Sequence, residues 1–266
     1  MIGRLEHESR RGGIYLAWLG LLLMAASFAW LQFSTPPPSL PQIAGEPTAP
    51  EEPVPVVVLD PGHGGQDSGT MKAGIPEKEL TLDIARRAQR LLQMHGVSTI
   101  LTRPDDSYVT LPGRAAIANK LPKCLFISIH FDDAEKSTAT GVETYYAAHQ
   151  ISDASRLASW LPFLQHIALD PPNTESQSLA GFIQEALVAH TQAVNRGTKP
   201  EQFFVVANVR HPAVLVEGGF LTNKEDVSKL SNADYREQIA AAITDGVIHY
   251  REVLQHQPAP LAITLP

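Results

Sequence analysis

The sequence contains only one cysteine, which excludes a fold held together by intramolecular disulfides. This residue, Cys124, opens an apolar run that continues to Ile127, so we expect a buried, inert thiol and not a nucleophile. With 266 residues and 44% hydrophobic content, the chain could form one or two domains. The patterns described below indicate one folded domain behind an N-terminal membrane segment.

Positive charge is also scarce, because 21 lysines and arginines stand against 28 acidic residues, a formal net charge of −7. A chain with this balance lacks the excess of positive charge that is typical of nucleic-acid-binding proteins, so we expect no nucleic-acid partner. Neither G-x-G-x-x-G nor G-x-x-x-x-G-K-[ST] occurs, which makes a nucleotide-binding loop the weaker interpretation of the glycine-rich stretch from Gly62 to Gly69. We find no internal repeat and no second binding module.

The N-terminus carries Arg4, Arg10 and Arg11, followed by an apolar run from Ile14 to Phe33. Twenty residues at a rise of about 1.5 Å each are enough to cross a hydrocarbon core of roughly 30 Å. The run is long for the apolar region of a signal peptide, and its small residues lie inside it and not after it. We therefore predict that residues 1–34 form an uncleaved membrane anchor, with a cleaved signal segment as the alternative. The arginines would stay in the cytoplasm while the rest of the chain is exported.

The remaining chain divides into three parts. Residues 35–55 are rich in proline and poor in apolar side chains, which predicts a semi-rigid extended linker. Residues 56–255 carry the strand and helix patterns of a catalytic domain, and residues 256–266 are predicted to be a disordered tail. Under this organisation the domain works outside the cytoplasm, in the periplasm or the cell wall.

The domain is organised around the stretch that begins at Val56. Four apolar residues from Val56 to Leu59 predict a strand buried on both faces, which Pro61 and Gly62 end abruptly. His63 therefore lies on a loop at the carboxyl end of a buried strand, where open α/β sheets place their ligands.

A second histidine follows the same pattern, since the apolar strand predicted from Cys124 to Ile129 stops at His130. In a parallel sheet both histidines would emerge at the same edge. A helix that opens with Glu77 and Glu79 lies between them in the sequence, and either carboxylate could instead be a partner of the helix dipole.

A further ionisable group, Glu217, follows the apolar strand from Ala213 to Val216. A purely structural role is the alternative for Glu217, as a carboxylate that caps a loop or pairs with an arginine. Together with His63, Glu77 and His130, however, it completes a hydrolytic zinc site: three protein ligands, an open position for water, and a carboxylate base. Glu79 is the rival of Glu77 for the ligand position.

Hydrophobic periodicity predicts the other elements. Helices are expected from Glu77 to Gly96, around 114–119, from Leu179 to Val194 and from Tyr235 to Leu254, with further strands at Val97–Leu101, Gly141–Tyr146 and Phe203–Val206. The stretch from Ala147 to Gln177 is irregular and broken by prolines, which indicates either a mobile rim over the cleft or a packed insertion.

These ordered motifs resemble the zinc-dependent N-acetylmuramoyl-L-alanine amidases of the Amidase_3 type. The resemblance rests on Leu59-Asp60-Pro61-Gly62-His63-Gly64-Gly65, Glu77-Lys78, Leu101-Thr102-Arg103, Arg114 with Ala118-Asn119, Ser128-Ile129-His130, Gly141-Val142-Glu143 and Pro212-Ala213-Val214-Leu215-Val216-Glu217-Gly218-Gly219-Phe220-Leu221-Thr222-Asn223. It covers the domain from Val56 to about Tyr250.

The resemblance implies a single α/β domain with a mixed, largely parallel sheet. It implies hydrolysis of the amide between the lactyl group of N-acetylmuramic acid and L-alanine in peptidoglycan. By motif position, the Zn²⁺ ligands would be His63, Glu77 and His130, and the catalytic carboxylate would be Glu217. The implied partners are the peptidoglycan substrate, the membrane through the N-terminal segment, and an activator protein that the sequence does not identify.

The chain departs from the family pattern after its second histidine. The family usually has a small residue and then asparagine there, whereas this chain has Phe131-Asp132-Asp133, a difference that bears on substrate contacts at this rim. His211 stands at a position where the family tolerates many residues, so we expect it at the surface. The alternatives are a zinc peptidase acting on the stem peptide and a non-catalytic module that binds the cell wall.

Overall fold

The computed structural model of the chain describes residues 55–71, 74–150 and 173–255, together with Met24, Ser27 and Trp30. Apart from these three residues, the predicted anchor lies outside the described residues, as do almost all of the predicted linker and the predicted tail. So does the middle of the predicted rim, residues 151–172. In the ranges that are described, no helix is both long enough and apolar enough to span a bilayer.

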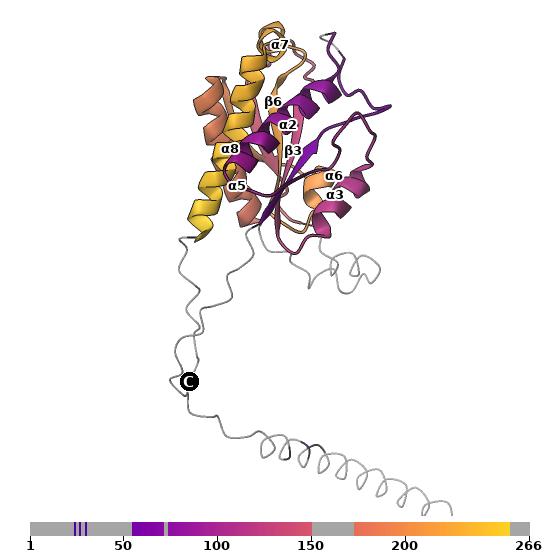
Figure 1. The fold of residues 1–266 in the computed structure, drawn as a ribbon, viewed down its shortest axis with the longest axis vertical. Coiled ribbons are helices and arrows are strands. Elements are labelled where there is room, and N and C mark those ends of the chain that lie inside the picture. The colour runs from indigo at the N-terminus through magenta and orange to yellow at the C-terminus, as the bar shows by residue number, and fades with distance from the viewer. Residues whose placement is uncertain are drawn as a thin grey trace, which may run out of the picture. The chain divides into compact units, whose positions relative to one another are not determined.

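A six-stranded mixed sheet forms the centre of the domain (Figure 1). Its strands lie in the order β2-β1-β3-β6-β4-β5. Among the six described strands, β4 and β6 form the one antiparallel pair, and every other neighbouring pair is parallel. The predicted mixed, largely parallel sheet is therefore confirmed. The strands are β1 (Val56–Pro61), β2 (Thr99–Leu101), β3 (Cys124–Asp132), β4 (Val142–Tyr146), β5 (Asn195–Pro200) and β6 (Ala213–Phe220).

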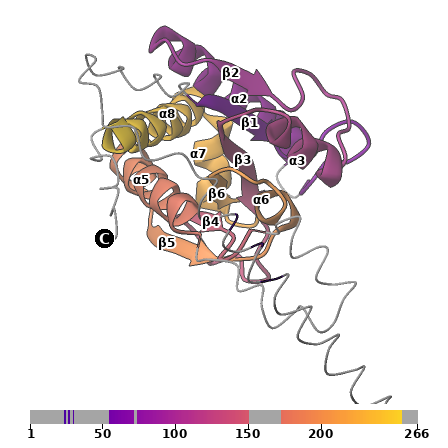
Figure 2. The same ribbon diagram turned by 90° about the horizontal axis from the view of Figure 1, so that it is seen from below.

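Helices cover both faces of this sheet, which makes the fold a three-layered α/β domain. Figure 2 shows α5 (Thr174–Thr191) and α8 (Ala233–Gln255) on one side, with α3 (Leu111–Asn119) and α6 (Phe204–Ala207) on the other. The long helix α2 (Glu77–Met94) packs on the same side as α8, and the short α7 (Lys224–Ser231) follows β6.

The alternation of side chains along β3 decides which layer carries the candidate site. Leu125, Ile127 and Ile129 point into the larger core, beneath α2, α5 and α8. Phe126 points into the smaller core beneath α3 and α6, and His130 shares its face of the strand. The candidate site therefore lies above the smaller core, at the carboxyl ends of the central strands. Cys124 is buried in this smaller core, and burial raises the pKa of its thiol to about 12, as expected for an inert cysteine.

The structure corrects three of the predicted elements and adds two. The predicted strand Phe203–Val206 is instead helix α6, because a short apolar run fits either kind of element. The strand β5 and the helix α7 were not predicted. In addition, β3 and β6 continue past their apolar runs and pair with each other there, so His130 and Glu217 lie inside strands and not after them.

Candidate metal centre

The loop after β1 carries His63 in a strained backbone conformation. His63 has a φ of 60°, in the left-handed region that residues other than glycine rarely adopt. A Cβ atom on Gly62 would lie 2.3 Å from Cε1 of His130, and one on Gly69 would lie 2.5 Å from Oε2 of Glu77. Glycine at these two positions therefore allows the backbone to approach the candidate ligands closely.

Two buried arginines hold the carbonyl groups of this loop. Arg103 donates through Nε to the carbonyl oxygen of Pro61 over 3.0 Å and through Nη2 to that of Gly62 over 2.7 Å. Arg114 donates through Nη2 to the carbonyl oxygen of His63 over 2.6 Å. Burial and the neighbouring Arg114 lower the pKa of Arg103 to about 10, which leaves it cationic at neutral pH. The two guanidinium groups thus fix the backbone that presents His63.

We expect Arg114→Met to destabilise the domain by about 3–5 kcal/mol, because the substitution leaves the carboxylate of Asp60 buried without its ion pair. Nη1 of Arg114 lies 2.8 Å from Oδ1 of Asp60, whose side chain is 1% exposed. Urea denaturation measures the effect. Arg90→Met, which removes a half-exposed ion pair with Glu237, is the matched control and should cost less than about 1 kcal/mol. Equal losses in the two variants would contradict this account of Arg114.

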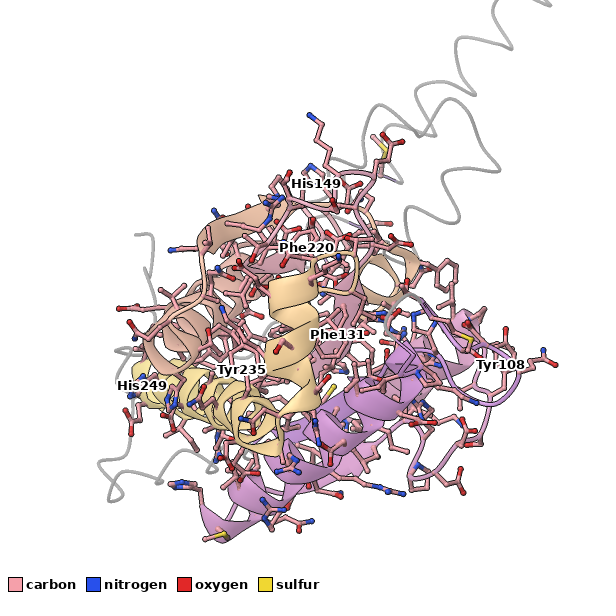
Figure 3. All side chains as sticks on the ribbon, turned by 90° about the horizontal axis from the view of Figure 1, so that it is seen from above. Tyr108, Phe131, His149, Phe220, Tyr235 and His249 are labelled. Carbon is pink, nitrogen blue, oxygen red and sulfur yellow. The ribbon has the colours of Figure 1, made fainter. Side chains whose placement is uncertain are left out.

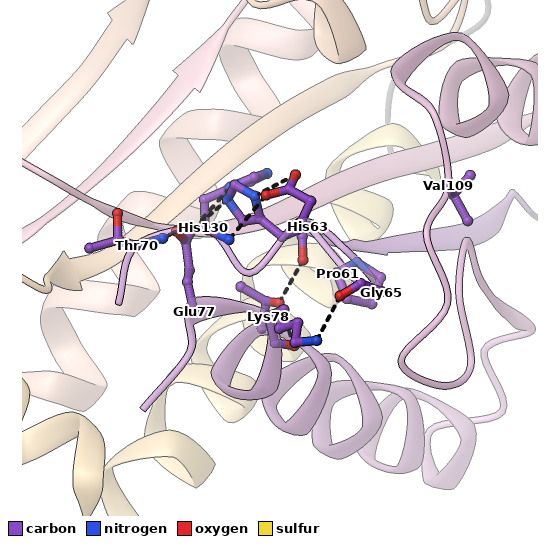
Figure 4. Close-up of polar contacts among 12 residues, drawn as sticks. Pro61, His63, Gly65, Thr70, Glu77, Lys78, Val109 and His130 are labelled. Atoms are coloured by element: carbon purple, nitrogen blue, oxygen red, sulfur yellow. Dashed lines mark hydrogen bonds and ion pairs between the residues drawn. The ribbon is translucent and has the colours of Figure 1, made fainter. Parts of the chain in front are cut away.

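Three side chains converge at this edge of the sheet, from the β1 loop, the first residue of α2 and strand β3 (Figure 4). Nε2 of His63 lies 3.1 Å from Oε1 of Glu77, and Nδ1 of His130 lies 3.2 Å from the same oxygen. One ligand atom from each residue lies within 4.8 Å of the other two. The structure therefore brings together the three residues that the sequence singled out as ligands.

Two of the spacings among these atoms are close to those expected around a zinc ion. Ligand bonds of about 2.0–2.1 Å in a tetrahedral arrangement place neighbouring ligand atoms about 3.3–3.4 Å apart. The two distances from Oε1 of Glu77 to the histidine nitrogens differ from this value by only a few tenths of an ångström. Two imidazoles and one carboxylate are also a common donor set for zinc, and three protein ligands leave a fourth position open.

Further contacts orient the three candidate ligands. Nδ1 of His63 lies 2.9 Å from Oδ2 of Asp67, which leaves Nε2 directed at the site. This is the arrangement in which a carboxylate fixes the tautomer of a metal-binding histidine. Glu77 accepts hydrogen bonds from the backbone amides of Thr70 and Phe131 over 3.0 and 3.1 Å.

Neighbouring side chains keep Glu77 ionised. Burial acts to raise the pKa of Glu77, but hydrogen bonds with His130 and His63 outweigh it and hold that pKa well below the usual range. Glu77 is therefore an anion throughout the physiological range, as a metal ligand must be. Its rival Glu79 is exposed and is not part of the cluster.

Glu217 lies next to the cluster on β6, in register with His130 on β3. Its Oε2 atom is buried and has no hydrogen-bond partner among the described residues. Burial, followed by the nearby charges of Glu77, Asp132 and Glu143, raises the pKa of Glu217 well above the usual value for a carboxyl group. An unpartnered carboxyl with a raised pKa beside a candidate metal site has the properties of a proton acceptor.

The residues that support this site have no role that can be assigned from the sequence alone. Arg103 and Arg114 belong to the sequence motifs, but a buried arginine leaves no periodic signal from which its contacts could be inferred. Asp67 lies four residues after His63, and that proximity was the one available signal. His211, predicted at the surface, is only partly exposed, and burial lowers its pKa. It lies outside the cluster of candidate ligands.

Comparison with known proteins identifies the family of the chain. The Amidase_3 family, described as N-acetylmuramoyl-L-alanine amidase, matches residues 57–249. The chain is 36% identical over 195 residues to the N-acetylmuramoyl-L-alanine amidase LytC of Bacillus subtilis, covering 73% of this chain and 35% of LytC. It is 32% identical over 228 residues to the amidase AmiA of Escherichia coli, covering 77% of this chain and 78% of AmiA.

A solved structure resembles the described fold. The CwlD amidase of Clostridioides difficile, solved in complex with the GerS lipoprotein, superposes with a TM-score of 0.63 at 28% identity and covers 75% of this chain and 100% of that chain. The family match, over residues 57–249, begins in β1 and ends within α8. The chain therefore belongs to the Amidase_3 family, the N-acetylmuramoyl-L-alanine amidases.

Proposed function

We propose that this chain is a zinc-dependent hydrolase that cleaves the amide between N-acetylmuramic acid and L-alanine in peptidoglycan. The observation that carries the proposal is the position of Glu217, whose Oε2 atom has no partner among the described residues, beside a cluster of three side chains that could hold a metal ion. Membership of the amidase family supplies the substrate class.

In this proposal His63, Glu77 and His130 hold the zinc ion. When bound there, zinc supplies a Lewis acid that polarises a carbonyl group and lowers the pKa of water to roughly 7. The loop fixed by Arg103 and Arg114 keeps His63 in place, so little reorganisation is needed when the substrate enters.

Glu217 acts as the general base and then as the general acid. Its Oε2 atom takes a proton from the attacking water and later donates that proton to the nitrogen of the leaving L-alanine. A carboxyl group with an ordinary pKa would be a weak base, so the environment that raises the pKa of Glu217 suits it to this step. The mechanism needs no covalent enzyme intermediate.

Analysis of the reaction products separates the proposal from its alternatives. Mass spectrometry of digested peptidoglycan should show glycan chains with free lactyl carboxyl groups and peptides that begin with L-alanine. A zinc peptidase would instead release a new end within the stem peptide. A module that only binds the wall would release no product, and either of these results would refute the proposed reaction.

The location and partners of the chain are part of the same proposal. A peptidoglycan amidase works outside the cytoplasm, and the arginine-flanked apolar run from Ile14 to Phe33 would anchor it to the inner membrane. CwlD, which this chain resembles, was solved with the GerS lipoprotein, so a membrane-attached partner protein is also proposed.

A reporter fusion tests the proposed topology. A phosphatase that is active only outside the cytoplasm, fused after Pro55, should be active, because the positive residues before the apolar run stay inside. The same fusion without residues 1–34 is the control and should be inactive. Activity of a reporter that works only in the cytoplasm, fused at the same position, would show that the orientation is wrong.

A further inference from the structure

A buried carboxylate on β4 gathers two cations beside the candidate catalytic residue. Glu143 is 1% exposed and lies in register with Glu217 across the antiparallel pair β4 and β6. Its Oε2 atom accepts hydrogen bonds from Nε of Arg196, over 2.9 Å, and from Nζ of Lys199. Its Oε1 atom accepts one from the hydroxyl of Tyr145 over 2.6 Å. Both oxygens of Glu143 are therefore occupied.

Both cations are still able to bind a further anion. The side chains of Arg196 and Lys199 are 33% and 39% exposed, whereas Glu143 is buried beneath them. Arg196 uses only its Nε atom, and in the described part of the chain its two terminal amino groups have no hydrogen-bond partner. Asp132 interacts electrostatically with Arg196, but among the described residues it makes no hydrogen bond to either cation.

The guanidinium group of Arg196 is held over the end of β6. Its central carbon lies 4.7 Å from the centre of the Phe220 ring, and Phe220 ends β6 shortly before α7 begins (Figure 3). Because the pairing of β3 with β6 shifts between His130 and Asp132, two steps on β3 correspond to three on β6. This bulge places Phe220 on the same face as Glu217. Arg196 therefore lies above the face that carries the site.

From these contacts we propose that Arg196, supported by Lys199, binds a free carboxylate on the peptide portion of the substrate. A guanidinium with two unused amino groups presents the paired donors that a carboxylate accepts. The proposal rests on the proposed function, because it assigns a substrate feature to the same site.

The chemistry of the substrate explains why the carboxylate belongs to the peptide. The lactyl carboxyl group of the muramoyl unit is consumed in the scissile amide, so the free carboxylates nearest that bond lie on the residues after L-alanine. Two extended residues span about 7 Å. Neighbouring strands lie about 4.8 Å apart, so β5 is roughly 10 Å from β6, and the side chain of Arg196 reaches back across that distance to Phe220.

A pair of peptidoglycan fragments tests this assignment. They differ only in the residue after L-alanine, which is D-glutamate with a free α-carboxyl group in one and its α-amide in the other. The wild-type protein should have a kcat/KM about tenfold higher for the acid, because a hydrogen bond to a charged group is lost in the amide. Arg196→Gln should remove this preference by raising KM for the acid about tenfold while leaving kcat and the amide unchanged.

Three further results complete the test. Arg196→Lys keeps the charge and should retain part of the preference, and Arg90→Gln, an arginine of the α2 surface, should retain all of it. Equal kinetics of the wild type on the two fragments, or an equal loss on both in Arg196→Gln, would overturn the proposal. Failure of the wild type to cleave either fragment or intact peptidoglycan would instead refute the proposed function.

Discussion

Glu217→Gln is expected to lose at least about a hundredfold in kcat while the protein keeps its zinc, since general-base catalysis contributes roughly 10²–10⁴-fold. Glutamine has nearly the shape of glutamate but cannot take a proton. Glu217 is not one of the three clustered ligands, so metal content should stay at the wild-type level. Hydrolysis of peptidoglycan at a near wild-type rate by this variant would show that Glu217 is not the base.

The same substitution should make the metal-free protein more stable, which provides an independent check on its environment. The pKa of Glu217 is raised in the folded state, so its ionised form carries a penalty there that the unfolded chain does not have. The penalty is absent below the unfolded pKa of about 4.3 and grows as the pH rises through the folded pKa. After chelation, thermal unfolding at pH 7 should therefore occur at a higher temperature in Glu217→Gln than in the wild type. At pH 4 the two should unfold at nearly the same temperature. A lower unfolding temperature for the variant at pH 7 would contradict this description of the site.

Glu77→Ala is expected to lose bound zinc and activity together, because it removes one of three protein ligands. The helix itself should survive, since Glu77 is only its first residue. Metal analysis of the purified variant and its rate on peptidoglycan are the two measurements. Loss of activity with zinc fully retained would mean that Glu77 is not a ligand.

Glu79→Ala is the matched control for this prediction. Glu79 is the same residue type, two positions further along the same helix, but it is exposed. The variant should keep both its zinc and its activity. If zinc were absent from Glu79→Ala and present in Glu77→Ala, the ligand would be Glu79 and not Glu77. The family membership would be unaffected.

Much of the central sheet could be predicted from the sequence because its strands are buried on both faces. Runs such as Val56–Leu59 and Cys124–Ile129 are apolar at every position, and their ends pointed to the edge where His63 and His130 meet. The outermost strand β5 was not predicted. The strand β5 has the sequence Asn-Arg-Gly-Thr-Lys-Pro, and it is held by backbone pairing to β4 and not by apolar side chains.

The supporting contacts of the site could not be predicted in the same way. Arg103, Arg114 and Glu143 each make contacts with residues more than twenty positions away in the sequence, so their roles depend on the finished fold. A charged residue is normally predicted to lie at the surface, and only the structure shows that these three are buried. The extension of β3 and β6 beyond their apolar runs was missed for the same reason, because it depends on the pairing between them.

The central claim is that a single zinc ion held by His63, Glu77 and His130 is required to hydrolyse the amide before L-alanine. The most direct test removes all metal with a chelator, adds zinc back in measured amounts, and follows the release of L-alanyl peptides from peptidoglycan. We predict no release without metal and a linear recovery that ends at one zinc per chain. Release of L-alanyl peptides by the metal-free protein, or recovery that continues well beyond one zinc per chain, would contradict the account.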